Sequence, residues 1–184
     1  MHEQVSGLKN SGVYFFRGDF EQILSGVVLD YVPRGVYIYD FRFPLFDFAG
    51  TNLTYSDRLH GNGFIGKGEM SERDIVSYIM ASQEVRNIFG ANAPLSLSAF
   101  VQYLLESNKA LIAPHARLIY AAALILLSQE SRAADILDEL PLILHPSDVP
   151  YCNLLRESLR QGLDVARALL DQVKEKNLRT FGLA

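Results

Sequence analysis

Residues Gly35–Asp47 read G-V-Y-I-Y-D-F-R-F-P-L-F-D, and large apolar side chains occupy every second position of this stretch. They are Tyr37, Tyr39, Phe41, Phe43 and Leu45. A period of two places such a set on one face of an extended strand, and aromatic residues suit a half-buried pleated surface. We therefore predict a central strand whose aromatic face packs against the core. Pro44 has no N–H to offer a neighbouring strand, so the strand ends there or lies at an edge.

The sequence before this strand predicts further strands. Residues 20–32 carry apolar side chains on both parities, which is typical of a strand that is covered on both faces. The tripeptide Pro33–Gly35 then predicts a hairpin turn. Two shorter apolar runs, Val13–Phe16 and Leu53–Tyr55, complete an antiparallel β-meander over residues 10–60.

The pattern changes after a glycine-rich connection over residues 61–70. Apolar side chains then recur every three to four residues, which predicts helices over residues 71–184. Ser71 with Asp74 resembles a capping box at the first helix. Strands followed by helices indicate the α+β class. We predict one domain over residues 1–184, in which an N-terminal antiparallel sheet of about three to four strands packs against a C-terminal layer of about six helices.

Composition and charge narrow the classes of function. The chain has 184 residues, of which 49% are hydrophobic and 21% charged, and its formal net charge is −4. Residues 1–70 hold six Lys/Arg and eight Asp/Glu, so neither end is basic, as a nucleic-acid-binding surface would be. The longest apolar run, Leu118–Leu127, is too short to span a bilayer, and the start lacks the apolar segment of a signal peptide. We expect a mildly acidic cytoplasmic protein that binds neither nucleic acid nor membrane.

Cofactor and metal motifs are weak in this sequence. Gly61–Gly66 reads G-N-G-F-I-G and matches the G-x-G-x-x-G pattern, but no strand–helix unit surrounds it. A flexible connection is therefore favoured over a phosphate-binding loop. The four histidines are scattered without metal-ligand spacing, and the single cysteine, Cys152, excludes an internal disulfide. We expect no metal and no cofactor.

One polar cluster, Tyr55–His60, is a candidate for acid–base chemistry. Within it Asp57 would supply a carboxylate, His60 an imidazole and Arg58 an anion-binding guanidinium. The alternative is a surface turn in which Asp57 pairs with Arg58. No nucleophile is identifiable by its spacing, so we favour the surface turn and name no catalytic residue.

The best candidate for a binding site is a partner-binding face on the predicted sheet. Asp40 and Arg42 share one face of the central strand, and Tyr and Arg are favoured at protein interfaces. The alternative is an ordinary wet sheet face with a cross-strand ion pair, which is the commoner arrangement. The candidate partner-facing residues are Tyr31, Tyr39, Asp40, Arg42, Asp57, Arg58 and His60.

Two functions follow as hypotheses. The first is a non-catalytic protein-interaction module, of the inhibitor or immunity-protein kind, that binds one protein partner; an acidic chain suits a basic partner. The second is a small-molecule-binding protein or enzyme with a pocket between the aromatic strand and the helices, with Asp57, Arg58 and His60 at its mouth. None of the motifs above identifies a family.

Overall fold

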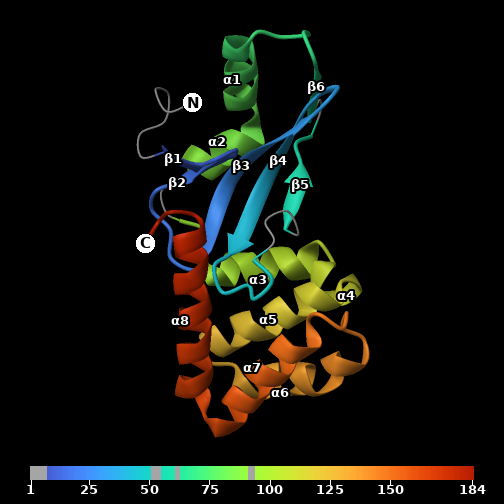
Figure 1. The fold of residues 1–184 in the computed structure, drawn as a ribbon, viewed down its shortest axis with the longest axis vertical. Coiled ribbons are helices and arrows are strands. Elements are labelled where there is room, and N and C mark those ends of the chain that lie inside the picture. The colour runs from blue at the N-terminus through green and yellow to red at the C-terminus, as the bar shows by residue number, and fades with distance from the viewer. Residues whose placement is uncertain (1–7, 51–54, 61–62, 91–93) are drawn as a thin grey trace. The chain divides into compact units, whose positions relative to one another are not determined.

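The structure, a computed structural model, describes residues 8–50, 55–60, 63–90 and 94–184 (Figure 1). The chain forms two compact units. Unit 1 comprises Met1–Phe43 and Asn52–Leu95, and unit 2 comprises Pro44–Thr51 and Ser96–Ala184. Strands come first and helices follow, so the predicted α+β class is confirmed. The expectation that residues 1–184 make one domain stays a prediction.

Unit 1 is built on an antiparallel sheet. Its strands are β1 (Leu8–Ser11), β2 (Tyr14–Arg17), β3 (Ile23–Val32), β4 (Gly35–Pro44), β5 (Ser56–Arg58) and β6 (Phe64–Gly66). β1 to β5 follow one another across the sheet in chain order, and β6 also pairs with β4. The described sheet therefore has six strands where the sequence predicted three or four. β5 and β6 contain three residues each, too few for a period of two to be recognised.

Two helices cover one face of this sheet. α1 (Glu72–Ala81) begins after Ser71, whose hydroxyl oxygen accepts a hydrogen bond from the N–H of Asp74, so the predicted cap is confirmed. α2 (Gln83–Gly90) follows directly. The hydrophobic cluster of this unit consists of Val27, Leu29, Val36, Ile38, Leu59, Ile65, Ile79 and Val85. The two members of this cluster on β4, Val36 and Ile38, alternate with the aromatic residues of the strand and thus lie on its opposite face.

The aromatic face of β4 meets the prediction only in part. Phe41 and Phe43 are buried, as expected of side chains against a core, but Tyr37 and Tyr39 are half-buried. The helices of unit 1 pack on the other face, where Val36 and its aliphatic neighbours supply the apolar surface. A strand with apolar residues on both parities can take a helix on either face, so its alternation does not choose between them.

The glycine-rich segment contributes a strand to the sheet. Gly66 lies opposite Gly35, and a Cβ atom on Gly35 would come within 2.1 Å of the carbonyl oxygen of Ile65. Glycine is therefore required there by the close approach of two backbones. In its described part the segment forms β6 and opens no phosphate-binding helix. Four residues of the predicted motif and short strand lie outside the described residues: Gly61, Asn62, Leu53 and Thr54.

Unit 2 is helical. Its helices are α3 (Leu97–Glu106), α4 (Lys109–Ile112), α5 (Pro114–Leu126), α6 (Glu130–Glu139), the 3₁₀ helix η1 (Leu140–Leu142), α7 (Val149–Gln161) and α8 (Leu163–Thr180). Together with α1 and α2, the described chain has eight α-helices where about six were predicted. α5 is buried over most of its length, as its nearly continuous apolar sequence indicates. None of the described helices combines the length and the apolar character that crossing a bilayer requires.

Two helices of unit 2 begin without a side-chain cap hydrogen bond. Ser131 lies inside α6, which begins at Glu130. Asp148 precedes α7, but its side chain makes no cap hydrogen bond and instead contacts His115. A carboxylate gains more from a neighbouring imidazolium than from a neutral N–H, so the ion pair takes precedence over the cap.

Candidate functional site

The structure separates the predicted partner-facing residues. Across the β4–β5 pair, Tyr39 lies opposite Arg58, and Asp40 lies opposite Asp57. Successive residues of a strand point to opposite faces, so these two pairs lie on different sides of the sheet. Tyr31 stands apart from both, near the end of β3, where it is 68% exposed.

Asp40, Arg42 and Asp57 form one ion-pair network, which we call the Arg42 network. The Arg42 guanidinium lies 2.8 Å from the Asp40 carboxylate and 3.4 Å from the Asp57 carboxylate. The N–H of Asp57 donates to the other Asp40 oxygen at 3.1 Å. Burial raises the pKa of the Asp40 carboxyl, while the charge and hydrogen bond of Arg42 act in the opposite direction. Asp40 is buried, so it offers a partner little surface.

The other face of β4 carries four side chains that we call the aromatic–arginine surface: Tyr37, Tyr39, Arg58 and Phe64. The ring centres of Tyr37 and Phe64 are 4.7 Å apart, and those of Tyr37 and Tyr39 are 6.2 Å apart. The Arg58 guanidinium lies 4.6 Å from the centre of the Tyr37 ring, which is a cation–π distance. Arg58 is exposed and the three rings are half-buried. The surface thus presents aromatic groups together with a cation that is already positioned.

The predicted acid–base cluster does not converge. Asp57 pairs with Arg42, Arg58 lies over a tyrosine ring, and the His60 ring contacts the Glu84 carboxylate at the start of α2. The His60 side chain is 91% exposed, so its pair lies in solvent. Each of the three predicted residues therefore has a separate partner, which argues against a shared acid–base site.

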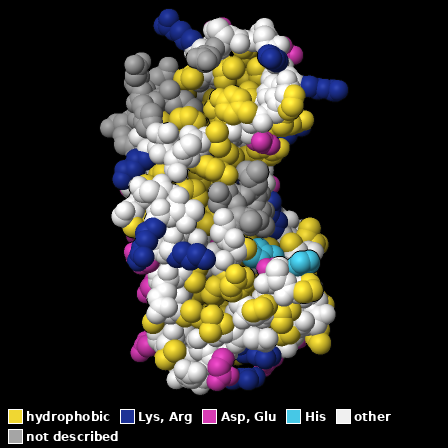
Figure 2. All heavy atoms as spheres, in the orientation of Figure 1, with side chains coloured by type: hydrophobic (Ala, Val, Ile, Leu, Met, Phe, Trp, Pro, Cys, Tyr) yellow, Lys and Arg dark blue, Asp and Glu magenta, His cyan; other side chains and the backbone are white. Residues whose placement is uncertain are grey.

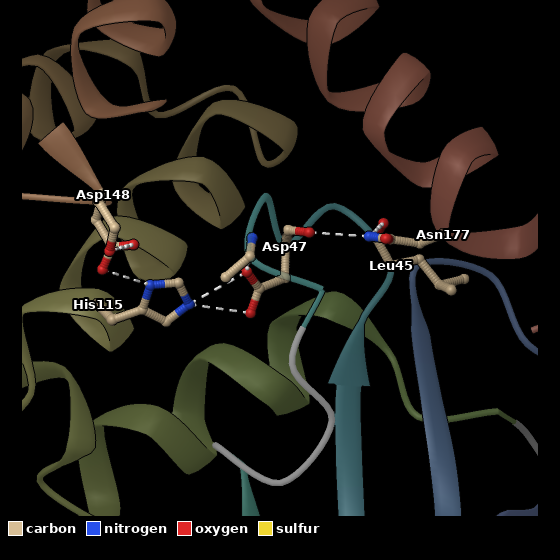
Figure 3. Close-up of polar contacts among 7 residues, drawn as sticks. Leu45, Asp47, His115, Asp148 and Asn177 are labelled. Atoms are coloured by element: carbon tan, nitrogen blue, oxygen red, sulfur yellow. Dashed lines mark hydrogen bonds and ion pairs between the residues drawn. The ribbon is translucent and has the colours of Figure 1, made fainter. Parts of the chain in front are cut away.

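Unit 2 holds a buried polar site that the sequence did not predict (Figure 3). His115, in the first turn of α5, bridges two carboxylates. Its Nε2 lies 3.1 Å from both carboxylate oxygens of Asp47, and its Nδ1 lies 3.1 Å from Oδ2 of Asp148. The Asp47 side chain is fully buried, and its Oδ1 also accepts a hydrogen bond from the N–H of Ala49.

Asn177 of α8 forms hydrogen bonds to the turn after β4, which contains Asp47. Its side-chain amide donates to the carbonyl oxygens of Leu45 and Asp47, at 2.8 and 2.9 Å. Asn177 is itself buried, so these bonds satisfy carbonyl groups that cannot reach water. The turn after β4 is thereby tied to α5, α7 and α8 within unit 2.

Two observations give this site a structural role. Both ring nitrogens of His115 face carboxylates, so both donate when the ring is protonated and neither is left to accept a proton from a substrate. Burial alone lowers the pKa of His115, but the hydrogen bonds and charges of Asp47 and Asp148 outweigh it and raise the pKa above its ordinary value of 6.5. The imidazolium thus stabilises two carboxylates that are withdrawn from solvent.

One member of this site had a signal in the sequence. Asp47 is the only charged residue in the apolar run Pro44–Ala49, and a charge inside such a run needs a partner when it is buried. Asp148 and Asn177 gave no such signal. Their partners lie 33 and at least 130 residues away along the chain, beyond the reach of any local pattern.

The residues that the structure describes include neither a metal-binding cluster nor a reactive thiol. No three His, Cys, Asp or Glu side chains among them lie close enough together to hold a metal ion. Cys152 is buried in α7, where burial raises the pKa of its thiol. Its Sγ lies 3.7 Å from the carbonyl oxygen of Leu137. A thiol with a raised pKa is a poor nucleophile, so Cys152 serves packing.

Unit 2 also exposes apolar side chains. Leu142 of η1 is 89% exposed, and Ile143, Tyr151 and Leu154 are exposed as well. Figure 2 shows hydrophobic side chains close to histidines in the lower part of the view. Exposed apolar side chains also occur singly on ordinary protein surfaces, so they are a weaker sign of a binding site than the aromatic–arginine surface.

Comparisons with known proteins assign no family. No family model matches the chain, and no curated protein or solved structure matches it either. The function is therefore inferred from the sites themselves.

Proposed function

We propose that this chain is a non-catalytic protein-interaction module that binds one protein partner through unit 1. The observation that carries the proposal is the aromatic–arginine surface on β4, β5 and β6. Tyr and Arg are enriched at the energetic centres of protein interfaces, because each combines a large contact area with a polar group. The rings already pack against one another, so binding costs little further side-chain entropy.

The position of Arg58 supports the same function. Its guanidinium carbon lies 4.6 Å from the centre of the Tyr37 ring, and the side chain is exposed, so its N–H groups can donate to carbonyl or carboxylate groups of a partner. The neighbouring strands hold this arrangement, since Arg58 lies directly opposite Tyr39 in the sheet. A rigid aromatic surface with an exposed cation is the arrangement that protein recognition favours.

A non-catalytic role is favoured over the enzyme alternative by the separate partners of Asp57, Arg58 and His60. The buried His115 has both nitrogens engaged as well. Within the class of interaction proteins, an inhibitor or immunity-type protein acting in the cytoplasm is the narrower hypothesis. Such a protein needs one tight partner and no chemistry of its own.

Affinity capture with tagged protein tests the proposal. The wild-type chain, an Arg58→Glu variant and a Lys9→Glu control are incubated with lysate of the source cells, and bound proteins are identified by mass spectrometry. Lys9 is exposed on β1, and its substitution changes the net charge by the same amount as Arg58→Glu. We expect one stoichiometric partner, retained by the control and reduced at least about tenfold by Arg58→Glu.

Two results would contradict this proposal. One is the absence of any stoichiometric partner for the wild-type chain. The other is a partner that the Arg58→Glu variant and a Tyr37→Ala variant both retain at full strength, which would move the interface away from the aromatic–arginine surface.

A further inference from the structure

Unit 1 contains a groove between the β3–β4 hairpin, β6 and the start of α1. Its volume is about 340 Å³, at the small end of the range for ligand sites. Val36 and Ile65, both buried members of the hydrophobic cluster, line it together with Ile75 of α1. Tyr31 and Met70, two exposed apolar side chains, complete the lining. The groove thus opens the hydrophobic cluster of unit 1 to solvent.

The free edge of β6 is blocked, so a partner cannot extend the sheet at Gly66. The N–H of Lys67 donates to the Arg34 carbonyl, and the N–H of Ile38 donates to the Gly63 carbonyl. These two bonds place the odd-numbered positions of this segment toward β4, so the Gly66 N–H points away from it. The Glu69 carboxylate accepts that N–H at 2.9 Å. Recognition of an occupant at this point therefore depends on the side chains that line the groove and not on the Gly66 N–H.

The cations beside the groove, Lys67 and Arg34, outnumber the one carboxylate that the hydrogen bonds place there, that of Glu69. Lys67 is the one charged residue among those that line the groove, and the backbone hydrogen bond places Arg34 beside it. Both side chains are exposed. Among the side chains that the structure describes, no carboxylate pairs with either of them. Figure 2 shows Lys and Arg side chains around hydrophobic ones at the upper end of unit 1.

We propose that this groove binds an acidic segment of the partner protein that carries a large apolar side chain. The apolar side chain covers Tyr31, Val36 and Ile65, and neighbouring carboxylates face Lys67 and Arg34. This inference rests on the proposed function, because the occupant is a stretch of protein. It also names the chemistry of that partner: an acidic segment, in spite of the acidic net charge of the chain.

A peptide that contains tryptophan provides a direct test, because the chain itself has no Trp. The probe is the blocked hexapeptide Asp-Glu-Trp-Leu-Glu-Asp, and its control carries Lys in place of all four acids. Probe and full-length chain are mixed, and the tryptophan emission is recorded. We expect a blue shift for the acidic peptide only, with an affinity that falls when salt is raised from about 50 to about 300 mM.

Variants test whether the acidic peptide binds at the groove. We expect the double variant Lys67→Glu/Arg34→Glu to lower the affinity for the acidic peptide at least about tenfold. Tyr31→Ala, made separately, should lower it to a similar extent. Lys9→Glu, exposed on β1, should leave the affinity unchanged. Circular dichroism of each variant confirms that the fold is kept. Equal binding of the two peptides, binding that these variants do not change, or no binding of the acidic peptide at millimolar concentration would overturn the inference.

The captured partner separates this inference from the proposed function. If the wild-type chain captures no partner, the proposed function fails and the inference fails with it. If a partner is captured equally by wild type and by Lys67→Glu/Arg34→Glu, the proposed function stands and the groove inference alone is wrong. Displacement of the partner by the acidic peptide, and not by the Lys peptide, is the expected result.

Discussion

Each unit of this protein places one cation between two carboxylates, but the two arrangements differ in burial and reach. In unit 1, Arg42 joins two carboxylates on adjacent strands, and its side chain and that of Asp57 are 22% and 44% exposed. In unit 2, His115 joins Asp47 and Asp148, which lie 68 and 33 residues away from it, and the Asp47 side chain is fully buried. The His115–Asp47 pair is less exposed to water than the Arg42–Asp57 pair, although Arg42 and His115 themselves are similarly exposed, at 22% and 19%. We therefore expect the ion pair of Asp47 to contribute more to the stability of its unit than the ion pair of Asp57 contributes on the sheet.

The two cations also differ in how they respond to pH. Arginine keeps its charge throughout the range in which proteins are folded. Histidine loses its charge within that range, and burial lowers the pKa of His115, but its two carboxylate partners outweigh burial and raise the pKa. Unit 2 thus has a pH dependence that comes from its cation, whereas the titrating group of the Arg42 network is the Asp40 carboxyl, whose pKa burial raises.

The largest effect that would test this comparison is expected from His115→Ala. The substitution leaves the buried Asp47 carboxylate without its cation, which costs about 3–5 kcal/mol in the free energy of unfolding. Urea denaturation followed by far-UV circular dichroism measures this loss. His145→Ala, an exposed histidine of the same unit, is the matched control and should be close to neutral. A loss for His115→Ala no larger than that of the control would remove the central role of the buried site.

Asn177→Ala is expected to have the next largest effect, a loss of about 2 kcal/mol, because two buried carbonyl groups lose their donor. Gln172→Ala lies on the same helix at an exposed position and serves as the control. Urea denaturation of both variants provides the measurement. Equal stabilities of the two would mean that the turn after β4 does not depend on α8.

The pH dependence of unit 2 sharpens the comparison further. Because folding raises the pKa of His115, its stabilisation is complete below pH 6.5 and disappears as pH rises through the folded-state pKa. The free energy of unfolding should fall by about 1.4 kcal/mol for each pH unit between the unfolded-state and the folded-state pKa of His115. A His115→Gln variant should lose this component of the pH profile. Parallel profiles of wild type and variant would contradict the assignment.

The smallest effect is expected from Asp57→Asn in the Arg42 network. The Asp57 side chain is half-exposed and lies 3.4 Å from Arg42, so its ion pair contributes less than about 1 kcal/mol. Thermal unfolding at low and high salt measures this contribution. A loss that matches His115→Ala would show that exposure does not distinguish the two arrangements.

Local patterns in the sequence predicted local structure. Ser71 caps α1, and the apolar run Leu118–Leu127 lies almost wholly in the buried α5. Each of these outcomes is determined by residues a few positions apart. The face of β4 that helices cover could not be predicted in this way, because it depends on where Ile79 and Val85 of later helices pack.

The sites, too, could be predicted only where their residues lie close together in the sequence. The Arg42 network was foreseeable, because Asp40 and Arg42 are two residues apart on one strand. The side of the sheet on which Arg58 would lie was not, because it depends on the pairing of β5 with β4. The His115 site requires four segments, those of Asp47, His115, Asp148 and Asn177, that only the folded helical unit brings together.

Amide hydrogen exchange of the chain, alone and with its captured partner, tests most directly whether unit 1 carries the interface. We predict slower exchange on binding in β4, β5, β6 and the β3–β4 hairpin of unit 1. The helices α5 to α8 of unit 2 should exchange as they do in the free chain, since their polar site serves the fold. Protection confined to η1 and α7, where Leu142 and Leu154 are exposed, would contradict the account and move the interface to unit 2.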